Sequence, residues 1–298
     1  MPSVPDHSKH LTKAGPDKAQ MTCVIIMPIH NEGAHLERVL TSYINQIHRP
    51  DQLILVNDGS TDQSEEIIDS WAQRHLWIDA VHIKKDPYHA PGAKIIKAFT
   101  QGFKAVKGTP DLIGKFDADI VLPETYFSTL INHFTEKPTL GMASGLLYIQ
   151  KNNQWSYEGL AKPSKIRGPV KLYRKACFDA IDGLKPFIGW DSMDQWLAMY
   201  HGWETQTYPE LIVQHLKPTG ALYRNNGQAQ QGEAYAYMRY GMILTFLSLA
   251  KLAWFYKRCS ILFLGLKHYE THQAQPLVSA QQGKFIRRHL WRGLFRAK

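Results

Sequence analysis

Short apolar runs alternate with helix-forming segments over the first third of this chain, and this alternation limits the fold more than any other feature. Residues 21–28 form a near-continuous apolar run, which is typical of a strand buried on both faces. Apolar side chains then recur at spacings of three and four from Leu36 to Ile44, as along one face of a helix that Asn31 is a candidate to cap. Further strands are predicted at 53–56, 80–83 and 112–116, with helices between them. Strands alternating with helices predict an α/β fold, with a mainly parallel central sheet flanked by helices.

The pattern becomes less regular after Pro123. A polar, Lys-rich loop is expected at 150–168, because no apolar periodicity runs through it. Apolar runs predict strands at 140–149, 170–173 and 211–215, and helices are predicted at 174–181 and 193–200. We therefore expect one catalytic domain over residues 21–220 and a separate C-terminal extension over 221–298.

Two features indicate the compartment. Residues 1–20 are polar and lack the apolar stretch of a secretory signal, so they are predicted to be a disordered lead-in. The three cysteines, Cys23, Cys177 and Cys259, are far apart and odd in number, which predicts neither a disulfide framework nor a cysteine-based zinc site. Both observations favour a reducing, cytoplasmic setting, with Cys23 and Cys177 as small buried residues.

The net charge of +9 is carried by the C-terminal end of the chain. Residues 251–298 contain ten Lys or Arg and one acid, whereas residues 1–250 contain 25 of each sign. Such asymmetry indicates an anionic partner, either a membrane surface, an acidic lipid or a nucleic acid. A solvated basic tail is the simpler alternative.

The basic segment is also rich in aromatic and aliphatic residues from 234 to 266. Its longest uncharged stretch, 240–250, is too short to span a bilayer, which needs about 20 apolar residues. Apolar helices interrupted by Lys and Arg suit the plane of a membrane interface. We therefore expect a basic amphipathic helical extension that binds an anionic membrane surface through residues 234–298, on the inner face of the cytoplasmic membrane. Packing of these helices on the catalytic domain is an alternative, and both can hold.

Polar and acidic residues follow three of the predicted strands. His30 and Glu32 follow the first, Asp58 follows the second, and Asp117 and Asp119 follow the fourth. Ligands of α/β sheets bind beyond the carboxyl ends of the strands, so we expect these side chains at one site. Two carboxylates one residue apart suit a hard divalent cation that a diphosphate also binds. Taken singly, such acids are often solvated loop or turn residues.

The order of these motifs resembles that of the inverting family 2 glycosyltransferases, which have the GT-A fold. The motifs are PIHNE at 28–32, NDGSTD at 57–62 and DAD at 117–119, and the similarity covers about residues 21–220. The resemblance implies a sugar-nucleotide donor whose nucleotide contacts Pro28, His30, Glu32, Asp58 and Ser60. It also implies that Asp117 faces the ribose and that Asp119 binds Mg²⁺ or Mn²⁺.

The same resemblance places the catalytic base at Asp191, because the family has a glycine eleven residues after the base and Gly202 stands at that distance here. The acceptor hydroxyl must lose a proton as it attacks the sugar, and a positioned carboxylate can take it. Trp190 is predicted to stack on the acceptor sugar, and Asp194 and Arg167 are further candidates for the acceptor site, Asp194 also as a rival base. A helix-capping Asp191 and a core Trp190 are the alternatives.

Two further residues are assigned to the donor. The resemblance places His215 as another metal contact, although a lone histidine is more often structural, and imidazole suits manganese better than magnesium. Lys94 would stand near the diphosphate as a point charge, and a solvated lysine is the alternative.

The predicted function is a metal-dependent inverting glycosyltransferase that acts on a lipid-linked or cell-surface glycan precursor. A nucleotidyltransferase that makes sugar nucleotides is a second interpretation, but the sequence PIHNEG stands where such enzymes have a Gly-rich loop. A non-catalytic nucleic-acid binder is a third, and no RNA-binding motif or zinc finger supports it. We expect no nucleic-acid partner.

Overall fold

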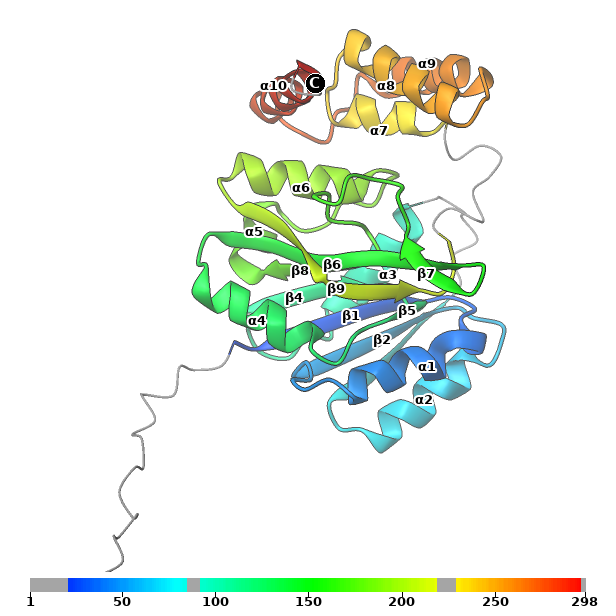
Figure 1. The fold of residues 1–298 in the computed structure, drawn as a ribbon, viewed down its shortest axis with the longest axis vertical. Helices are drawn as coiled ribbons and strands as arrows, with labels where there is room; N and C mark the ends of the chain where they lie inside the picture. The colour runs from blue at the N-terminus through cyan, green and yellow to red at the C-terminus, as the bar shows by residue number, and fades with distance from the viewer. Residues whose placement is uncertain (1–20, 85–91, 219–228, 296–298) are drawn as a thin grey trace, which may run out of the picture.

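The computed structural model describes residues 21–84, 92–218 and 229–295, so the predicted lead-in over residues 1–20 lies outside it. In the described residues a nine-stranded sheet runs through the middle of the molecule, with helices on both faces (Figure 1). This is the α/β architecture that the alternating pattern predicts. A group of C-terminal helices lies above the sheet in this view.

The strands are β1 (Cys23–Ile29), β2 (Gln52–Asp58), β3 (Ile78–Ile83), β4 (Leu112–Phe116), β5 (Ile120–Val121), β6 (Leu140–Lys151), β7 (Gln154–Tyr157), β8 (Val170–Arg174) and β9 (Glu204–His215). Their order in the sheet is β3-β2-β1-β4-β8-β6-β9-β5, with β7 paired to β6. The first four strands are parallel, as predicted. Antiparallel pairing of β8 with β4 and β6 makes the sheet as a whole mixed.

The helices are α1 (Gly33–Ile44), α2 (Ser64–Arg74), α3 (Ala93–Phe103), α4 (Tyr126–Glu136), α5 (Lys175–Ala180), α6 (Trp190–Tyr200), α7 (Gln231–Tyr237), α8 (Met242–Phe255), α9 (Ser260–His272) and α10 (Ala280–Phe295). Apolar faces of α1, α2 and α4 enclose one core against the sheet. Those of α3, α5 and α6 enclose a second core on the opposite face. Burial on both faces explains why β1, β2 and β4 carry nearly continuous apolar runs, whereas β3 at the edge of the sheet is only partly buried.

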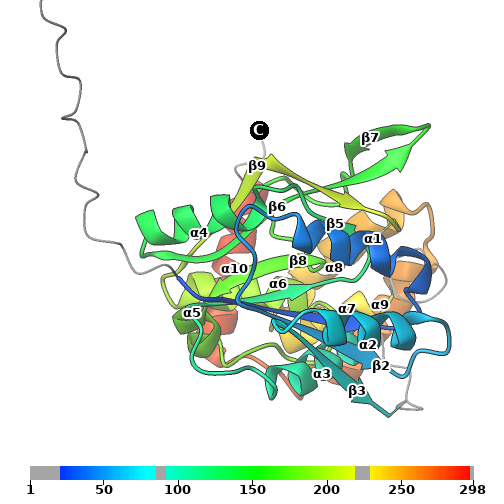
Figure 2. The ribbon, with the colours of Figure 1, turned by 90° about the horizontal axis from the view of Figure 1, so that it is seen from below.

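Two segments differ from the sequence-based expectation. The predicted loop at 150–168 contains β7, which forms a hairpin with the end of β6 that projects from the sheet (Figure 2). Strand β9 begins at Glu204, seven residues before the predicted start at 211. Its first half pairs with β6 through the backbone but leaves alternate side chains exposed, so it carries no apolar run.

The C-terminal helices pack on the part of the fold that contains the sheet. Ala234 of α7, Met238 directly after that helix and Ile286 of α10 are buried in the same core as α6. Gly189, just before α6, has a φ of 93°, and a Cβ there would lie only 2.8 Å from that of Ala234. The C-terminal extension therefore packs on the rest of the fold through its inner face, which is the alternative given above to membrane binding. None of the helices in the described ranges combines the length and apolar character needed to cross a bilayer.

Candidate active site

The loops after β1 and β2 are tied together by hydrogen bonds. The Asn31 amide donates to Ser60 Oγ at 3.1 Å, and the Thr61 amide donates to Asn31 Oδ1 at 2.8 Å. Asn31 has a φ of 55° and lies outside α1, which begins at Gly33 without a side-chain cap. The prediction that Asn31 caps this helix is therefore wrong, because its side chain bridges the two loops. Ser60 is placed at the edge of the sheet by the same bridge.

Asp58 contacts two of the other residues that are predicted to bind the nucleotide, His30 and Lys94. His30 Nδ1 donates to the Asp58 carbonyl at 2.8 Å, which leaves Nε2 of the neutral ring as the acceptor. Lys94, in the first turn of α3, places Nζ 3.2 Å from Asp58 Oδ2. Pro28 is buried in β1 opposite Val56, two residues before His30.

Glu32, Asp117 and Asp119, which we call the strand-end acids, lie together beyond β1 and β4. Burial, followed by repulsion from Asp119 and Asp117, raises the pKa of Glu32 despite its ion pair with Lys217. Burial also raises the pKa of Asp117, although Lys115 opposes it through a hydrogen bond. The three carboxylates are near enough for their charges to repel one another.

His215 joins the strand-end acids to the projecting hairpin. Its Nε2 lies 3.5 Å from Asp119 Oδ2, and its Nδ1 lies 3.5 Å from Glu158 Oε1. Burial disfavours the charged imidazole, but Asp119 and Glu158 outweigh it and raise the pKa of His215 to about 9. Glu158 in turn pairs with Arg167 at 3.3 Å, so Arg167 is held by a buried carboxylate. Asp119 Oδ1 is buried and has no hydrogen-bond partner among the described residues.

Asp191 lies in the first turn of α6, across a short segment from the strand-end acids. A Cβ on Gly168 would lie 3.6 Å from Asp191 Oδ2, and the adjacent Pro169 carbonyl accepts the Asp117 amide at 2.8 Å. Burial would raise the pKa of Asp191, but nearby cations outweigh it and lower this pKa below its usual range. These cations, which we call the cation group, are Lys165, Lys171, Arg167 and Lys115. The Asp191 carboxylate is therefore ionised at neutral pH.

Two residues predicted for the acceptor site are buried instead. Asp194 is 3% exposed and accepts 2.7 Å hydrogen bonds from Lys171 Nζ and a 2.5 Å bond from the Tyr173 hydroxyl. Trp190 is 7% exposed, and the ammonium groups of Lys115 and Lys171 lie 5.0 and 5.2 Å from its ring centre. Their contacts are thus internal, and we correct the assignment of both from acceptor contact to support of the site.

The sequence analysis missed three charged residues of the site. Lys115 is the charged residue of the otherwise apolar β4, Lys171 stands between Val170 and Leu172 in β8, and both lysines are almost fully buried. A lysine inside such a run is a usable signal, because lysine is almost never fully buried unless it is paired. Glu158 carries no comparable signal, since a glutamate in a polar loop is usually exposed.

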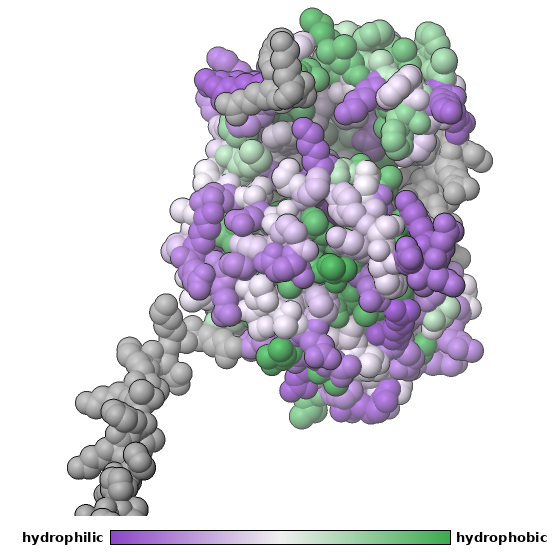
Figure 3. Space-filling view, in the orientation of Figure 1, coloured by the Kyte–Doolittle hydropathy of each residue, from purple (hydrophilic) through white to green (hydrophobic). Residues whose placement is uncertain are grey.

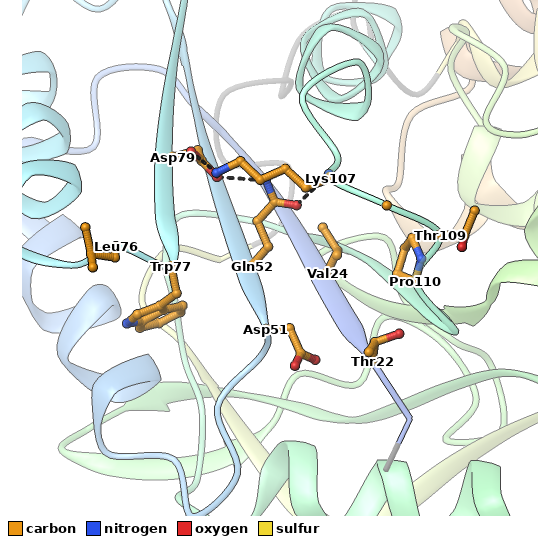
Figure 4. A pocket seen from close by; sticks show the side chains of 11 residues that line it. Thr22, Val24, Asp51, Gln52, Leu76, Trp77, Asp79, Lys107, Thr109 and Pro110 are labelled. Atoms are coloured by element: carbon orange, nitrogen blue, oxygen red, sulfur yellow. Dashed lines mark hydrogen bonds and ion pairs between the residues drawn. The ribbon is translucent and has the colours of Figure 1, made fainter. Parts of the chain in front are cut away.

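A separate cavity of about 340 Å³ lies at the opposite, amino-terminal edge of the sheet (Figure 4). Its polar groups are paired with one another: Lys107 Nζ lies 2.8 Å from Asp79 Oδ1, and Gln52 donates to Asp79 Oδ2 at 2.7 Å. None of the predicted site residues lines it. The predicted site residues therefore lie away from this cavity.

Comparisons with solved structures show the fold. The chain superposes on the mannosyltransferase PcManGT from Pyrobaculum calidifontis, solved with GDP-Man and Mn²⁺, with a TM-score of 0.56 and 16% identity over 97% of this chain and 85% of that one. GalNAc-T7, solved with UDP, GalNAc and Mn²⁺, gives a TM-score of 0.61 and 13% identity over 92% of this chain and 55% of that one.

Sequence comparisons show the family. EpsJ of Bacillus subtilis, an uncharacterized glycosyltransferase, is 30% identical over 133 residues, 45% of this chain and 36% of EpsJ. The minor teichoic acid biosynthesis protein GgaB of the same organism is 34% identical over 114 residues, 38% of this chain and 12% of GgaB. The match thus spans about a third or less of these relatives' own length. Residues 24–187, more than half of the chain, match glycosyl transferase family 2. The chain therefore belongs to that family and has the GT-A fold.

Proposed function

We propose that the protein is a metal-dependent inverting glycosyltransferase that moves a sugar from a nucleotide-sugar to an acceptor hydroxyl, with Asp191 as the base. One observation carries this proposal: the ionised Asp191 carboxylate lies close to the strand-end acids. It is next to Gly168, and the following residue, Pro169, accepts a hydrogen bond from the Asp117 amide. A donor diphosphate at the strand-end acids would thus present its sugar toward Asp191. A carboxylate on the far side of the sugar from the leaving group suits a single displacement, which inverts the configuration at the anomeric carbon.

The nucleotide would bind at the ends of β1 and β2. His30 and Asp58 form one wall of this part, and Ser60 lies beside them. Lys94 is 20% exposed and stands at the amino end of α3, where backbone amides and the helix dipole favour an anion. The donor phosphates would compete with Asp58 for the Lys94 ammonium group.

Asp119 and His215 would hold the divalent cation. The unpartnered Oδ1 of Asp119 and the 3.5 Å distance from Oδ2 to His215 Nε2 fit a shared ion. A carboxylate with an imidazole favours Mn²⁺ over Mg²⁺, because magnesium prefers oxygen ligands. When bound, the ion would offset the charge that develops on the leaving nucleoside diphosphate. The Mn²⁺ in two structural relatives supports this assignment.

The cation group would control the basicity of the Asp191 carboxylate during the reaction. Without a donor, it keeps the carboxylate ionised but weakly basic, because it lowers the pKa. A bound diphosphate brings negative charge next to Lys115 and Arg167, so the carboxylate would become a stronger base when the donor is present. Asp191 would then accept the proton of the acceptor hydroxyl. This dependence would limit activation of water in the empty site.

The acceptor is proposed to be a lipid-linked or cell-surface glycan precursor at a membrane. The outward side of α8 and α9 is both apolar and basic, with Trp254 82% and Phe263 70% exposed. Figure 3 shows hydrophobic residues gathered over these helices at the top of the molecule. We call this surface the apolar–basic face; it comprises Met242, Ile243, Phe246, Leu247, Lys251, Trp254, Phe255, Lys257, Arg258, Phe263, Leu264 and Lys267. A relative named for teichoic acid biosynthesis is consistent with such an acceptor.

Donor turnover tests the enzymatic part of the proposal. The full-length protein is incubated with a panel of nucleotide-sugars, with Mn²⁺, with Mg²⁺ or with a chelator, and release of nucleoside diphosphate is measured. We expect one donor to be hydrolysed slowly without acceptor, and only with a divalent ion. Proton NMR of the first product then gives the anomeric configuration. Metal-independent turnover, or retention of configuration, would sink the proposed mechanism.

Vesicle binding tests the membrane part. The double variant Trp254→Ser/Phe263→Ser should lose most sedimentation with vesicles that contain an anionic phospholipid, because two exposed apolar groups are removed from the interface. Leu76→Ser is the matched control, since Leu76 is 98% exposed at the far, amino-terminal edge of the sheet. Equal sedimentation of both variants and the wild type would show that the apolar–basic face does not bind lipid.

A further inference from the structure

Helices α7 and α9 approach each other closely enough to bring three metal-binding side chains together, far along the chain from the donor site. A Cβ on Gly232 would lie 1.8 Å from the Gly265 carbonyl oxygen, so only glycine permits this contact. Glu233 follows Gly232 directly, and His268 and His272 lie three and seven residues after Gly265 on α9. Positions three and seven residues apart share one face of a helix, so both imidazoles point to the side that meets α7.

Ligand atoms of Glu233, His268 and His272 all lie within 4.8 Å of one another. We propose that these three residues form a binding site for a zinc-like transition-metal ion, which joins α7 to α9. Two imidazoles and one carboxylate are a ligand set that tetrahedral Zn²⁺ accepts, with water in the fourth position. Tetrahedral ligand atoms stand about 3.4 Å apart at ordinary zinc bond lengths, so small rotations of half-buried side chains close the site.

The surroundings already orient two of the ligands. His272 Nδ1 donates to the His268 carbonyl at 2.8 Å, so the lone pair of the neutral ring is on Nε2. A backbone hydrogen bond from the second ring nitrogen is the usual partner of a metal-bound histidine. The Tyr237 ring packs edge-on against His272 with centroids 5.6 Å apart. The Tyr237 phenol lies within hydrogen-bonding reach of the Glu233 carboxylate.

The site is distinct from the proposed donor metal in its ligands and its preference. Asp119 lies with His215 at the end of β9, whereas the three residues here belong to the C-terminal helices. Two imidazoles favour zinc over the magnesium and manganese that oxygen ligands select. An ion here would fix α9 against α7 and so stiffen the helices that carry the apolar–basic face.

The test uses full-length protein made without a polyhistidine tag, stripped with a chelator and titrated with Zn²⁺ by calorimetry. The Asp119→Asn variant serves as background, so that the donor metal does not contribute. We expect one Zn²⁺ per chain in this background, and a rise in melting temperature of about 5 °C at 100 times the dissociation constant. Adding His272→Gln should raise the dissociation constant for Zn²⁺ more than about 100-fold. Loss of a residue that only hydrogen-bonds to a metal ligand already weakens metal affinity by about 10–100-fold, and here a ligand itself is lost.

Two exposed residues give matched controls: His201→Gln and Glu270→Gln should leave the affinity unchanged. Glu233→Gln provides a second variant of near-identical shape, and metal-free melting curves identify any variant that fails to fold. With Co²⁺ in place of Zn²⁺, the site should give the strong visible absorption of a tetrahedral ion. Absence of Zn²⁺ binding in the Asp119→Asn protein overturns the proposal, as does equal affinity in the His272→Gln and His201→Gln variants. Either result leaves the proposed glycosyl transfer intact, since that depends on other residues.

Discussion

Carboxylates at the two edges of the central sheet have different surroundings. At the amino-terminal edge, Asp51 accepts the Cys23 amide at 2.7 Å, and Asp111 accepts the amide and the hydroxyl of Thr22 at 2.8 and 2.9 Å. Each carboxylate there is satisfied by the fold itself. Such groups hold the starts of the strands and need no ligand.

At the carboxyl edge the acids also have cationic partners, but for Glu32 and Asp117 these partners do not offset the effect of burial. Glu32 and Asp117 have raised pKa values, chiefly because they are buried, and Asp119 keeps a buried oxygen without a partner among the described residues. Groups held in this unfavourable state are typical of functional sites, where a ligand supplies what the fold does not. The comparison therefore assigns stability to one edge and chemistry to the other.

The largest effect is expected at Asp191. Asp191→Asn should lower kcat by about 10²–10⁴, because an amide cannot accept the proton of the acceptor. Donor affinity, measured by calorimetry, should change little, since the proposed role of Asp191 is to accept the proton of the acceptor. Asp182→Asn is the control: this side chain is 90% exposed, and asparagine tolerates its φ of 56°. Full activity in the Asp191 variant would place the base elsewhere.

The second largest effect is a loss of stability, which we expect at the buried pair of Lys171 and Asp194. Lys171 is fully buried and pairs with Asp194 at 2.7 Å, so Lys171→Met leaves a buried carboxylate without its cation. Breaking such a pair lowers the free energy of unfolding by about 3–5 kcal/mol. Urea unfolding measures this loss, and Lys175→Met is the control, because the Lys175–Asp179 pair is partly exposed and worth less than about 1 kcal/mol. Equal losses in both variants would mean that burial of the pair is unimportant.

The third effect concerns pH. Because the cation group lowers the pKa of Asp191, this carboxylate favours the folded state above its ordinary pKa of about 4, and that contribution is lost as pH falls through the lowered value. Lys165→Met removes one cation, so the pKa of Asp191 should rise. The acid limb of kcat/KM, scaled to each protein's own maximum, should therefore move to higher pH. Lys162→Met, a substitution of a neighbouring exposed lysine, is the control. If the acid limb of the pH profile does not move in Lys165→Met, Lys165 does not affect the pKa of the catalytic base.

Sequence patterns predicted the half of the fold that is buried on both faces. The bounds of β4 agree with the predicted 112–116, because two-sided burial demands a continuous apolar run. The rule that ligands bind at strand ends also located Glu32, Asp58 and the carboxylates after β4. It could not show that Trp190 is covered by lysines from β4 and β8, since those contacts join residues 19 to 75 positions apart. Pairing between distant segments is a property of the fold and not of any local pattern.

The smallest effect tests the amino-terminal edge and thus the comparison itself. Asp111→Ala removes the acceptor of two Thr22 hydrogen bonds, which are partly exposed and together worth about 1–2 kcal/mol. The free energy of unfolding should fall by that amount, while kcat and KM stay near wild type, because these bonds lie at the opposite end of β1 from the strand-end acids. Thr109→Ala, in the same cavity wall, is the control for general disturbance of this edge. If Asp111→Ala lowered kcat several-fold without affecting stability, the two edges would be coupled, and the separation of stability from chemistry would fail.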